Sequence, residues 1–166
     1  MEEIDDIFNE EPSEWAKQVY IVYIEQHHMV QNTKGDEFNK QDYYDNPHKF
    51  TPVFHSTYLK YFSVIVNCMY WDYKYQRLIT DEQMKNMVLS KESRLIGVCD
   101  ITCDYLGSIE FLKKFTDSES PFYTYEPISQ KITDGSHGQI ENGILYHAMD
   151  FLPCELGFDA SSYFGS

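Results

Sequence analysis

The stretch RLIGVCDITCDYLGSIEF, residues 94–111, is the part of the sequence that decides the fold. It opens with a nearly continuous apolar run, formed by Leu95, Ile96, Val98 and Cys99. Such a run is typical of a strand that is buried on both faces in a parallel sheet. The stretch then becomes polar at Asp100, Thr102 and Asp104. Because ligands bind at the carboxyl ends of strands in open parallel sheets, this change predicts a ligand at the strand tip. The alternative, which the pattern leaves open, is that the aspartates only cap a turn or a following helix.

The preceding segments extend this pattern. SVIVNCMY, residues 63–70, predicts a second buried strand, and we expect its end at residues 67–70 to be a neighbour of residues 100–104. Between the two strands, Thr80 and Gln83 have the spacing of a capping box, and apolar residues follow at helical spacing. A strand, a helix and a second strand predict a right-handed βαβ crossover.

Further segments complete the α/β prediction. The apolar run QVYIVYI, residues 18–24, predicts another strand that is covered on both faces. A hydroxyl residue followed by proline predicts a helix over residues 51–62. Residues 121–133 and 142–150 predict two strands joined by a loop, and Pro153 predicts the start of a last helix. We therefore expect a partial parallel sheet followed by a C-terminal hairpin-and-helix segment.

Composition limits the classes of partner. The chain has 166 residues, of which 42% are hydrophobic and 16% aromatic, so one domain with a real core is expected. The net charge of −14 disfavours nucleic acid and anionic membranes as partners, and no apolar run approaches the length of about 18 residues that spans a bilayer. Residues 1–15 predict an acidic, solvated leader. Because this N-terminus is neither apolar nor rich in arginine, we expect a cytoplasmic protein, with mitochondria as the alternative.

Histidines and cysteines predict neither a metal site nor a catalytic residue. The four cysteines are Cys68, Cys99, Cys103 and Cys154. They have no zinc-ligand spacing, which favours reduced thiols in an intracellular protein. His27 and His28 are adjacent, so on a strand they would point to opposite faces and could not share one ion. Cys103 has no base that would activate it, and His147 either lines the cleft or is a satisfied strand histidine.

Several motifs occur in order along the chain: VYIVYIEQHHMV, YYDNPHKF, VNCMYW, RLIT, VCDITCDYLGSIEF and AMDFLP. Together they resemble the lysine-ketoglutarate reductase half of alpha-aminoadipic semialdehyde synthase and, more distantly, the lysine-forming saccharopine dehydrogenases. The similarity covers nearly the whole chain after about residue 15. It implies a partial Rossmann-like sheet and a nicotinamide cofactor, NADP or NAD. It also implies that lysine condenses with 2-oxoglutarate and that the imine is reduced to saccharopine.

The resemblance also implies residues for two kinds of ligand. The cofactor contacts are Tyr70 at the adenosine end, Ile101 through its backbone, and Met149, Asp150, Phe151 and Leu152 near the nicotinamide. The residues that hold the amino-acid product are Thr102, Cys103 and Asp104. The residue types suit this role, because a carboxylate accepts hydrogen bonds from an ammonium group and a hydroxyl can bind a carboxylate. Around Tyr105 and Leu106 the family usually has a small residue or glycine, and this chain has two bulky side chains.

Two features of the family are not found in this sequence. None of the eight glycines forms the G-x-G-x-x-G turn that holds the pyrophosphate of a dinucleotide. In the family, that turn and the acid–base lysine and histidine lie upstream of the matching segment. We therefore expect residues 16–111 to be the later part of a cofactor domain and residues 112–166 to be a returning segment of the substrate domain.

Two functions remain open at this point. The chain is either a piece of a saccharopine-forming reductase that completes its site with another segment, or a non-catalytic relative that binds a partner or a small ligand. We expect no saccharopine-forming activity from the isolated chain, because the phosphate cradle and the acid–base pair are missing. An incomplete sheet also predicts association with a second copy or with the missing N-terminal half.

Overall fold

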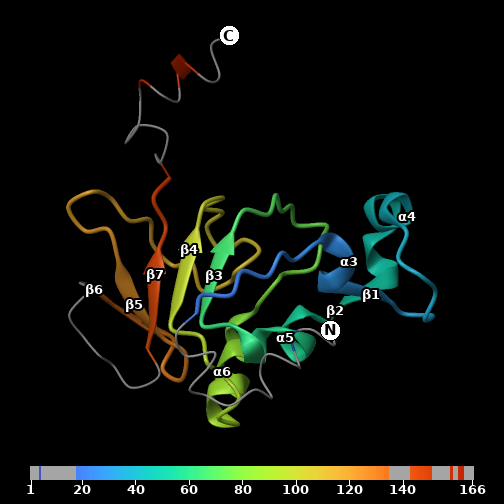
Figure 1. Ribbon diagram of the computed structural model, residues 1–166, viewed down its shortest axis with the longest axis horizontal. Helices are drawn as coiled ribbons and strands as arrows, with labels where there is room; N and C mark the ends of the chain where they lie inside the picture. Colours follow the sequence, from blue (N-terminus) through green and yellow to red (C-terminus); the bar gives the residue numbers. More distant parts are fainter. Residues whose placement is uncertain (1–3, 5–17, 135–142, 151–157, 159–160, 163–166) are drawn as a thin grey trace.

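The computed structural model describes Ile4, residues 18–134, residues 143–150, Phe158 and residues 161–162. Its helical segments are α3 (Gln26–Met29), α4 (Lys40–Asp45), η1 (Pro47–Lys49), α5 (Phe54–Thr57), η2 (Leu59–Tyr61) and α6 (Asp81–Leu89). Its strands are β1 (Val30–Asn32), β2 (Phe50–Pro52), β3 (Val64–Asn67), β4 (Gly97–Asp100), β5 (Tyr123–Glu126), β6 (Lys131–Asp134) and β7 (Ile144–His147). Figure 1 shows these elements along the chain. No helix in the described ranges has the length and apolar character needed to cross a membrane.

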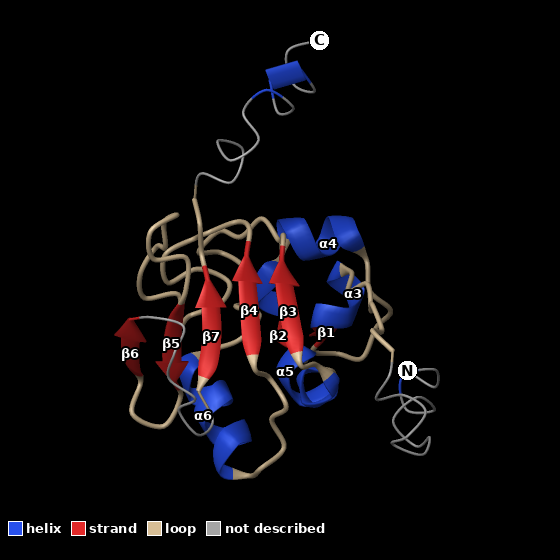
Figure 2. Ribbon diagram, turned by 60° about the vertical axis from the view of Figure 1, so that its left-hand side comes forward, coloured by secondary structure: helices blue, strands red, loops and turns tan. Residues whose placement is uncertain are grey.

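A five-stranded sheet in the order β3-β4-β7-β5-β6 forms the centre of the molecule. β4 runs parallel to β3 and to β7, whereas β5 is antiparallel to β7 and to β6. Figure 2 shows the three parallel strands pointing to one edge, where loops gather. The prediction of an α/β fold with a partial Rossmann-like sheet is therefore confirmed, and so is the expected neighbourhood of the two strand tips, because Asn67 is in register with Asp100.

Helix α6 forms the predicted crossover between β3 and β4. Its capping box is present, since Thr80 Oγ1 accepts from Gln83 N at 3.2 Å and Thr80 N donates to Gln83 Oε1 at 2.9 Å. Met84 and Met87 are buried on the side that faces the core. The cap fixes where the helix begins, and the apolar face fixes how it packs.

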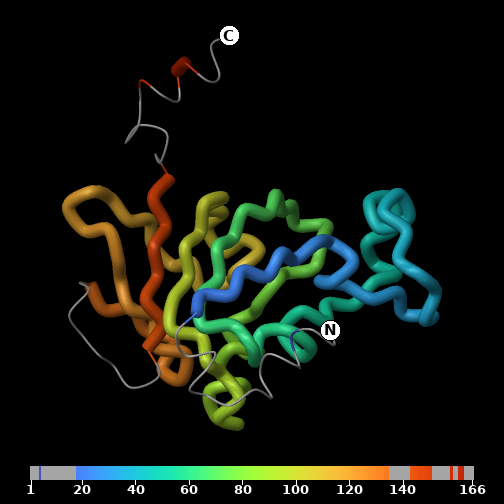
Figure 3. Tube along the Cα trace, viewed as in Figure 1, coloured from blue at the N-terminus to red at the C-terminus, as the bar shows by residue number. Residues whose placement is uncertain are grey.

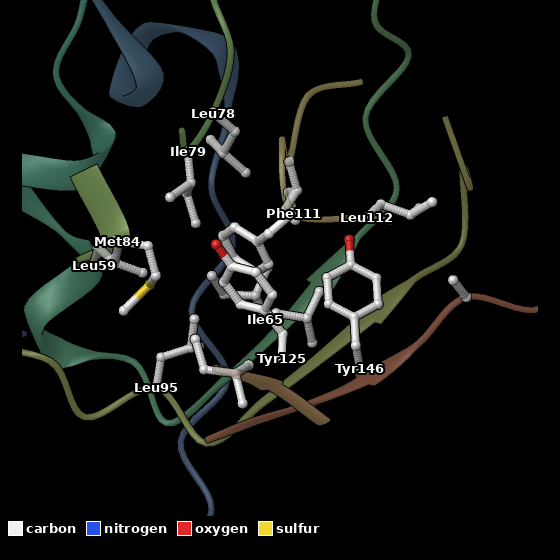
Figure 4. Packing of buried hydrophobic residues seen from close by; sticks show 14 of the residues in the cluster. Leu59, Ile65, Leu78, Ile79, Met84, Leu95, Phe111, Leu112, Tyr125 and Tyr146 are labelled. Atoms are coloured by element: carbon white, nitrogen blue, oxygen red, sulfur yellow. The ribbon is translucent and has the colours of Figure 1, made fainter. Parts of the chain in front are cut away.

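The core lies on one face of the sheet and is rich in aromatic rings (Figure 4). The rings of Tyr123 and Tyr146 stack with centroids 5.2 Å apart, and those of Phe111 and Tyr125 stack at 4.8 Å. Offset ring pairs of this kind add to the stabilisation that comes from burying apolar area. The tyrosines on β5 and β7 are thus core residues.

The opposite face of β3 differs from the sequence prediction. Ile65 and Asn67 are buried, but Val64 and Val66 are 55% and 63% exposed. The strand is therefore covered on one face rather than on both. A continuous apolar run cannot distinguish these cases, because it has the right residues for either face. Association through this surface stays a prediction.

Residues 18–24 do not form the predicted strand. The segment is an extended stretch that leads into α3 (Figure 3), and it has no strand partner among the described residues. Val19 and Ile21 are more than 90% exposed, whereas Ile24 packs against the core. Strand propensity alone does not make a strand, because the backbone groups need a neighbouring edge to pair with.

The helix predicted over residues 51–62 is also wrong in its first part. Thr51 and Pro52 pair with β1 in a two-stranded sheet, so α5 begins only at Phe54. Among the apolar residues of this segment, Phe54, Tyr58 and Leu59 are buried, and Phe62 is partly buried against the core. The polar segment before it contains the short helix α4.

The C-terminal part is built differently from the predicted pair of strands. Residues 121–133 are not one strand but supply a hairpin, β5 and β6, in which Gln130 adopts a φ of 56°. β7 then pairs with β5 on one side and with β4 on the other, so residues before and after position 111 share one sheet. Of the last helix predicted from Pro153, only Phe158 and residues 161–162 are described, and they are helical; the rest lies outside the described residues. The division of the chain into parts of two domains stays a prediction.

Candidate ligand site at the strand tips

The carboxyl ends of β3, β4 and β7 bring most of the predicted site residues to one edge of the sheet. Tyr70 follows β3 and is 79% exposed, and Ile101 follows β4 and is 41% exposed. Thr102, Cys103 and Asp104 continue the loop after β4, and Met149 and Asp150 follow β7. Phe151 and Leu152 lie outside the described residues.

Asp100 is the centre of a buried hydrogen-bond network at the base of this edge. It is 1% exposed. Asn67 Nδ2 donates to Asp100 Oδ1 at 2.9 Å, and Tyr146 OH donates to Oδ2 at 2.8 Å. Thr102 Oγ1 and the backbone N–H of Cys103 also donate to Oδ1, at 3.0 and 3.1 Å. Asp100 therefore caps the turn after β4, as the alternative interpretation of the sequence had it, and links three parallel strands.

The hydroxyl of Tyr146 stays protonated, as a hydrogen-bond donor to Asp100 requires. Burial, and next the charge of Asp100, raise the pKa of the Tyr146 hydroxyl far above its usual value. The hydroxyl is therefore a permanent donor to the buried carboxylate. A buried carboxylate is tolerated only when donors surround it, and here they come from β3, β7 and its own turn.

The turn after Asp100 has an unusual backbone. Cys103 and Leu106 adopt φ angles of 51° and 50°, in the left-handed region that disfavours side chains with a Cβ. A Cβ on Gly107 would lie 2.3 Å from Asp104 Cβ and 2.6 Å from the Asp104 carbonyl oxygen, so only glycine fits there. The left-handed angle at Leu106 gives a physical reason for the glycine or small residue that the resemblance implies around this position.

Asp104 is the acid in this loop that remains open to a ligand. Its side chain is only partly buried, and it makes no hydrogen bond within the described part of the chain. Burial, and next the charge of Asp100, raise the pKa of the Asp104 carboxyl. An ammonium group placed beside Asp104 would lower this raised pKa again, because an opposite charge favours the ionised form of the carboxyl.

Cys103 is not arranged as a nucleophile. Its thiol donates to the carbonyl oxygen of Asp100 at 2.8 Å, and burial, followed by the charge of Asp100, raises its pKa to about 12. The thiol is therefore protonated at neutral pH. Cys99 Sγ lies 3.6 Å from His147 Nδ1, and burial raises the pKa of Cys99 as well. The described residues contain no group of three side chains that could hold a metal ion.

His27 and His28 lie on α3 rather than on a strand, with ring centroids 3.8 Å apart. The expectation that they point to opposite faces was therefore wrong. His28 Nδ1 accepts a hydrogen bond from Glu25 N at 3.0 Å, which satisfies the start of this short helix. Burial, and next the neighbouring His27, lower the pKa of His28, so this ring tends to be neutral.

Three residues that support the site were not singled out from the sequence. Ser108 Oγ accepts from Asn67 Nδ2 at 3.0 Å, and Tyr146 donates to Asp100. Arg77 donates to the carbonyl oxygens of Leu106 and Gly107. The one available signal was the arginine in the motif RLIT, since a charged residue beside an apolar pair often has a specific partner.

Comparison with known proteins gives the relatives of this chain. No protein-family model matches it. Alpha-aminoadipic semialdehyde synthase of Arabidopsis thaliana is 40% identical over 154 residues, which cover 90% of this chain and 14% of the relative. The mitochondrial alpha-aminoadipic semialdehyde synthases of Mus musculus and Bos taurus are 29% and 28% identical over 188 aligned residues, which cover 96% of this chain and 20% of each relative.

The chain thus spans a fifth or less of the length of these curated relatives. The mammalian relatives are named mitochondrial, which agrees with the alternative compartment and gives no support to the cytoplasmic one. The resemblance to alpha-aminoadipic semialdehyde synthase is confirmed, and the chain is a homologue of a segment of these proteins, whereas the match to their lysine-ketoglutarate reductase half stays a prediction.

Proposed function

We propose that this chain is a segment of a saccharopine-forming reductase of lysine degradation and that the strand tips form part of its ligand site. The observation that carries the proposal is the partly buried Asp104 carboxylate, which has no hydrogen-bond partner within the described residues, at the edge where three parallel strands end. The similarity to alpha-aminoadipic semialdehyde synthases supports it. The mitochondrial names of the mammalian relatives make mitochondria the proposed compartment.

On the substrate side, Asp104 would accept hydrogen bonds from an ammonium group of lysine or saccharopine. A charge-assisted bond of this kind is shorter and stronger than a neutral one. Thr102 is less free than its exposure suggests, because its hydroxyl already donates to Asp100 Oδ1 at 3.0 Å. The Thr102 hydroxyl oxygen also lies 3.1 Å from Asn67 Nδ2, so a ligand carboxylate would have to compete for it.

On the cofactor side, the residues fit only part of a nicotinamide dinucleotide. The exposed ring of Tyr70 offers a face for the adenosine end, and Ile101 lies at the neighbouring strand tip. Met149 and Asp150 follow the third parallel strand and would lie near the nicotinamide. The chain has no glycine-rich turn for the pyrophosphate, so the proposal assigns that contact to another segment of a longer protein. The cofactor, when bound, supplies the hydride that reduces an imine to an amine.

A second candidate is a non-catalytic binding protein that descends from the reductase. The observation that favours it is Leu106, a bulky residue with a φ of 50° where the resemblance implies a small residue or glycine. A protein with an altered turn at Leu106 could keep the fold and lose the reductase activity. The two candidates differ in ligand binding at Asp104.

Calorimetric titration of the purified chain with saccharopine, lysine and NADPH tests the proposal. We expect saturable binding of lysine or saccharopine, and we expect Asp104→Asn to weaken it about tenfold, the effect of losing one charge-assisted hydrogen bond. Asp36→Asn is the matched control, because Asp36 is an exposed aspartate in the loop after β1. It should leave the affinity unchanged.

Binding of neither amino acid, or equal affinity in Asp104→Asn, would contradict the proposal and favour the second candidate. The isolated chain should show no lysine-dependent oxidation of NADPH with 2-oxoglutarate present. Turnover in that assay would show that the missing phosphate turn is not needed.

A further inference from the structure

Arg77 occupies a position between the loops that follow β3 and β4. Its guanidinium donates hydrogen bonds to two consecutive carbonyl oxygens, those of Leu106 and Gly107. Its Cζ also lies 4.7 Å from the centroid of the Trp71 ring. One side chain therefore contacts both loops at the ligand edge.

Each of these contacts lies beside a residue of the proposed site. Trp71 directly follows Tyr70, and Trp71 Nε1 donates to the carbonyl oxygen of Gln76 at 3.2 Å, which closes the first loop. In the second loop, Gly107 N donates to the carbonyl oxygen of Asp104 at 2.7 Å. Arg77 thus connects the neighbour of Tyr70 to the turn that carries Asp104.

The backbone brings the two loops together and holds the turn only in part, through Gly107 N to the carbonyl oxygen of Asp104 and Leu106 N to that of Leu112 at 3.3 Å. Leu78 N and Ile79 N donate to the carbonyl oxygen of Ser108 at 2.8 and 3.2 Å, after the turn has ended. At Leu106, the left-handed φ of 50° is a strained conformation that the surroundings must hold. The Arg77 hydrogen bonds to Leu106 and Gly107 act at this strained point.

Arginine suits this position better than lysine does. A planar guanidinium can stack on an aromatic ring and at the same time donate to two acceptors, whereas an ammonium group is a point donor on a flexible stem. Glu110 Oε1 lies 3.7 Å from Arg77 Nε and balances the charge. The Arg77 side chain is 25% exposed, so these interactions are partly shielded from water.

We propose that Arg77 is a positioning residue that holds the turn at Asp104 and couples it to the Tyr70 loop. Ligand binding at one loop would then change the affinity at the other, because both loops share one rigid contact. The ligand-binding half of this inference rests on the proposed function, and the structural half does not.

Hydrogen exchange of single amides tests the structural half. In Arg77→Met, we expect the Gly107 amide to exchange about tenfold faster, because the turn loses two hydrogen bonds from a charged donor. The Leu145 amide, which donates to Ile96 in the sheet at 2.9 Å, should keep its protection. Arg94→Met removes a guanidinium before β4, at the opposite end of that strand, and should change neither amide.

Unchanged exchange at Gly107 in Arg77→Met would overturn the proposal. If that variant loses protection throughout, the milder Arg77→Lys decides. A selective increase at Gly107 in Arg77→Lys supports positioning, and exchange like that of the unmodified chain overturns it.

Titration of lysine in the absence and presence of NADPH tests the coupling. With Arg77 intact, we expect NADPH to change the lysine affinity, and we expect this change to disappear in Arg77→Lys. Equal coupling in both proteins would overturn the role of Arg77. No effect of NADPH on the lysine affinity of the unmodified chain would overturn the coupling. Failure of the unmodified chain to bind lysine would instead contradict the proposed function, and the exchange of Gly107 would still decide whether Arg77 holds the turn.

Discussion

Asp100 and Asp104 lie at the two ends of one short turn, and their surroundings differ in almost every respect. Asp100 is 1% exposed and accepts hydrogen bonds from β3, from β7 and from its own turn. Asp104 is partly exposed, and its carboxylate has no partner within the described residues. Acids that are close in sequence at a strand tip can therefore have separate tasks, one in holding the sheet and one in meeting a ligand.

The register of β4 explains the difference. Val98 and Asp100 lie on the face of β4 that points into the core, because alternate residues of a strand share a face. A carboxylate in that position must find donors inside the protein. Asp104 comes after the strand has ended and carries no such constraint.

The largest expected effect comes from Asp100→Ala, which tests the structural side of the comparison. The substitution leaves the buried Tyr146 hydroxyl and the Cys103 amide without their acceptor and removes one of the acceptors of Asn67 Nδ2, so the free energy of unfolding should fall by about 3 kcal/mol or more. Urea unfolding followed by circular dichroism measures this change. Asp104→Ala is the matched variant and should change stability by less than about 1 kcal/mol. Equal losses in the two variants would remove the distinction between the acids.

A smaller effect is expected for Gly107→Ala, which tests how tightly the turn holds Asp104. The added methyl group meets the Cβ of Asp104 at 2.3 Å and its carbonyl oxygen at 2.6 Å, so the backbone has to move. We expect a loss of about 2 kcal/mol in unfolding free energy and weaker binding of lysine. Gly35→Ala is the control, because Gly35 has a φ of 81° but no atom near its Cβ position. Gly35→Ala should lose about 1 kcal/mol in unfolding free energy and bind lysine normally. A Gly107→Ala protein that binds lysine with full affinity would show that the turn adapts to the added methyl group.

The smallest effect concerns the pH dependence of stability at Asp104. Because burial and Asp100 raise the pKa of Asp104, the folded chain holds its proton up to a higher pH than the unfolded chain does. Between the ordinary carboxyl pKa of about 4 and the raised value, this group lowers the unfolding free energy as pH rises. Asp104→Asn should lose this decline and gain a little stability at neutral pH, less than about 0.5 kcal/mol.

Urea unfolding of the unmodified and Asp104→Asn proteins from pH 3 to pH 8 measures the difference. Asp36→Asn corrects for the loss of one exposed carboxylate. If instead the unmodified protein becomes more stable than Asp104→Asn as pH rises, the Asp104 carboxylate is stabilised by a partner.

Local sequence signals predicted the parts of the fold whose partners lie close along the chain. Thr80 and Gln83 were enough for the start of α6, because a capping box is complete within four residues. The change from apolar to polar residues at Asp100 located the strand tip. The prediction failed for residues 18–24 and for Thr51 and Pro52, since strand and helix signals there depend on which edge is free to pair.

The sequence by itself thus determined the βαβ unit, the edge at which polar side chains gather, and the resemblance to the alpha-aminoadipic semialdehyde synthases. Only the tertiary structure decided the roles of the side chains at that edge. It placed Tyr146, 46 residues from Asp100 along the chain, within hydrogen-bonding distance of it, and it brought Arg77 onto the turn at Leu106. The physical reason is that hydrogen-bond partners of buried groups are set by strand order and register, which no short stretch of sequence contains.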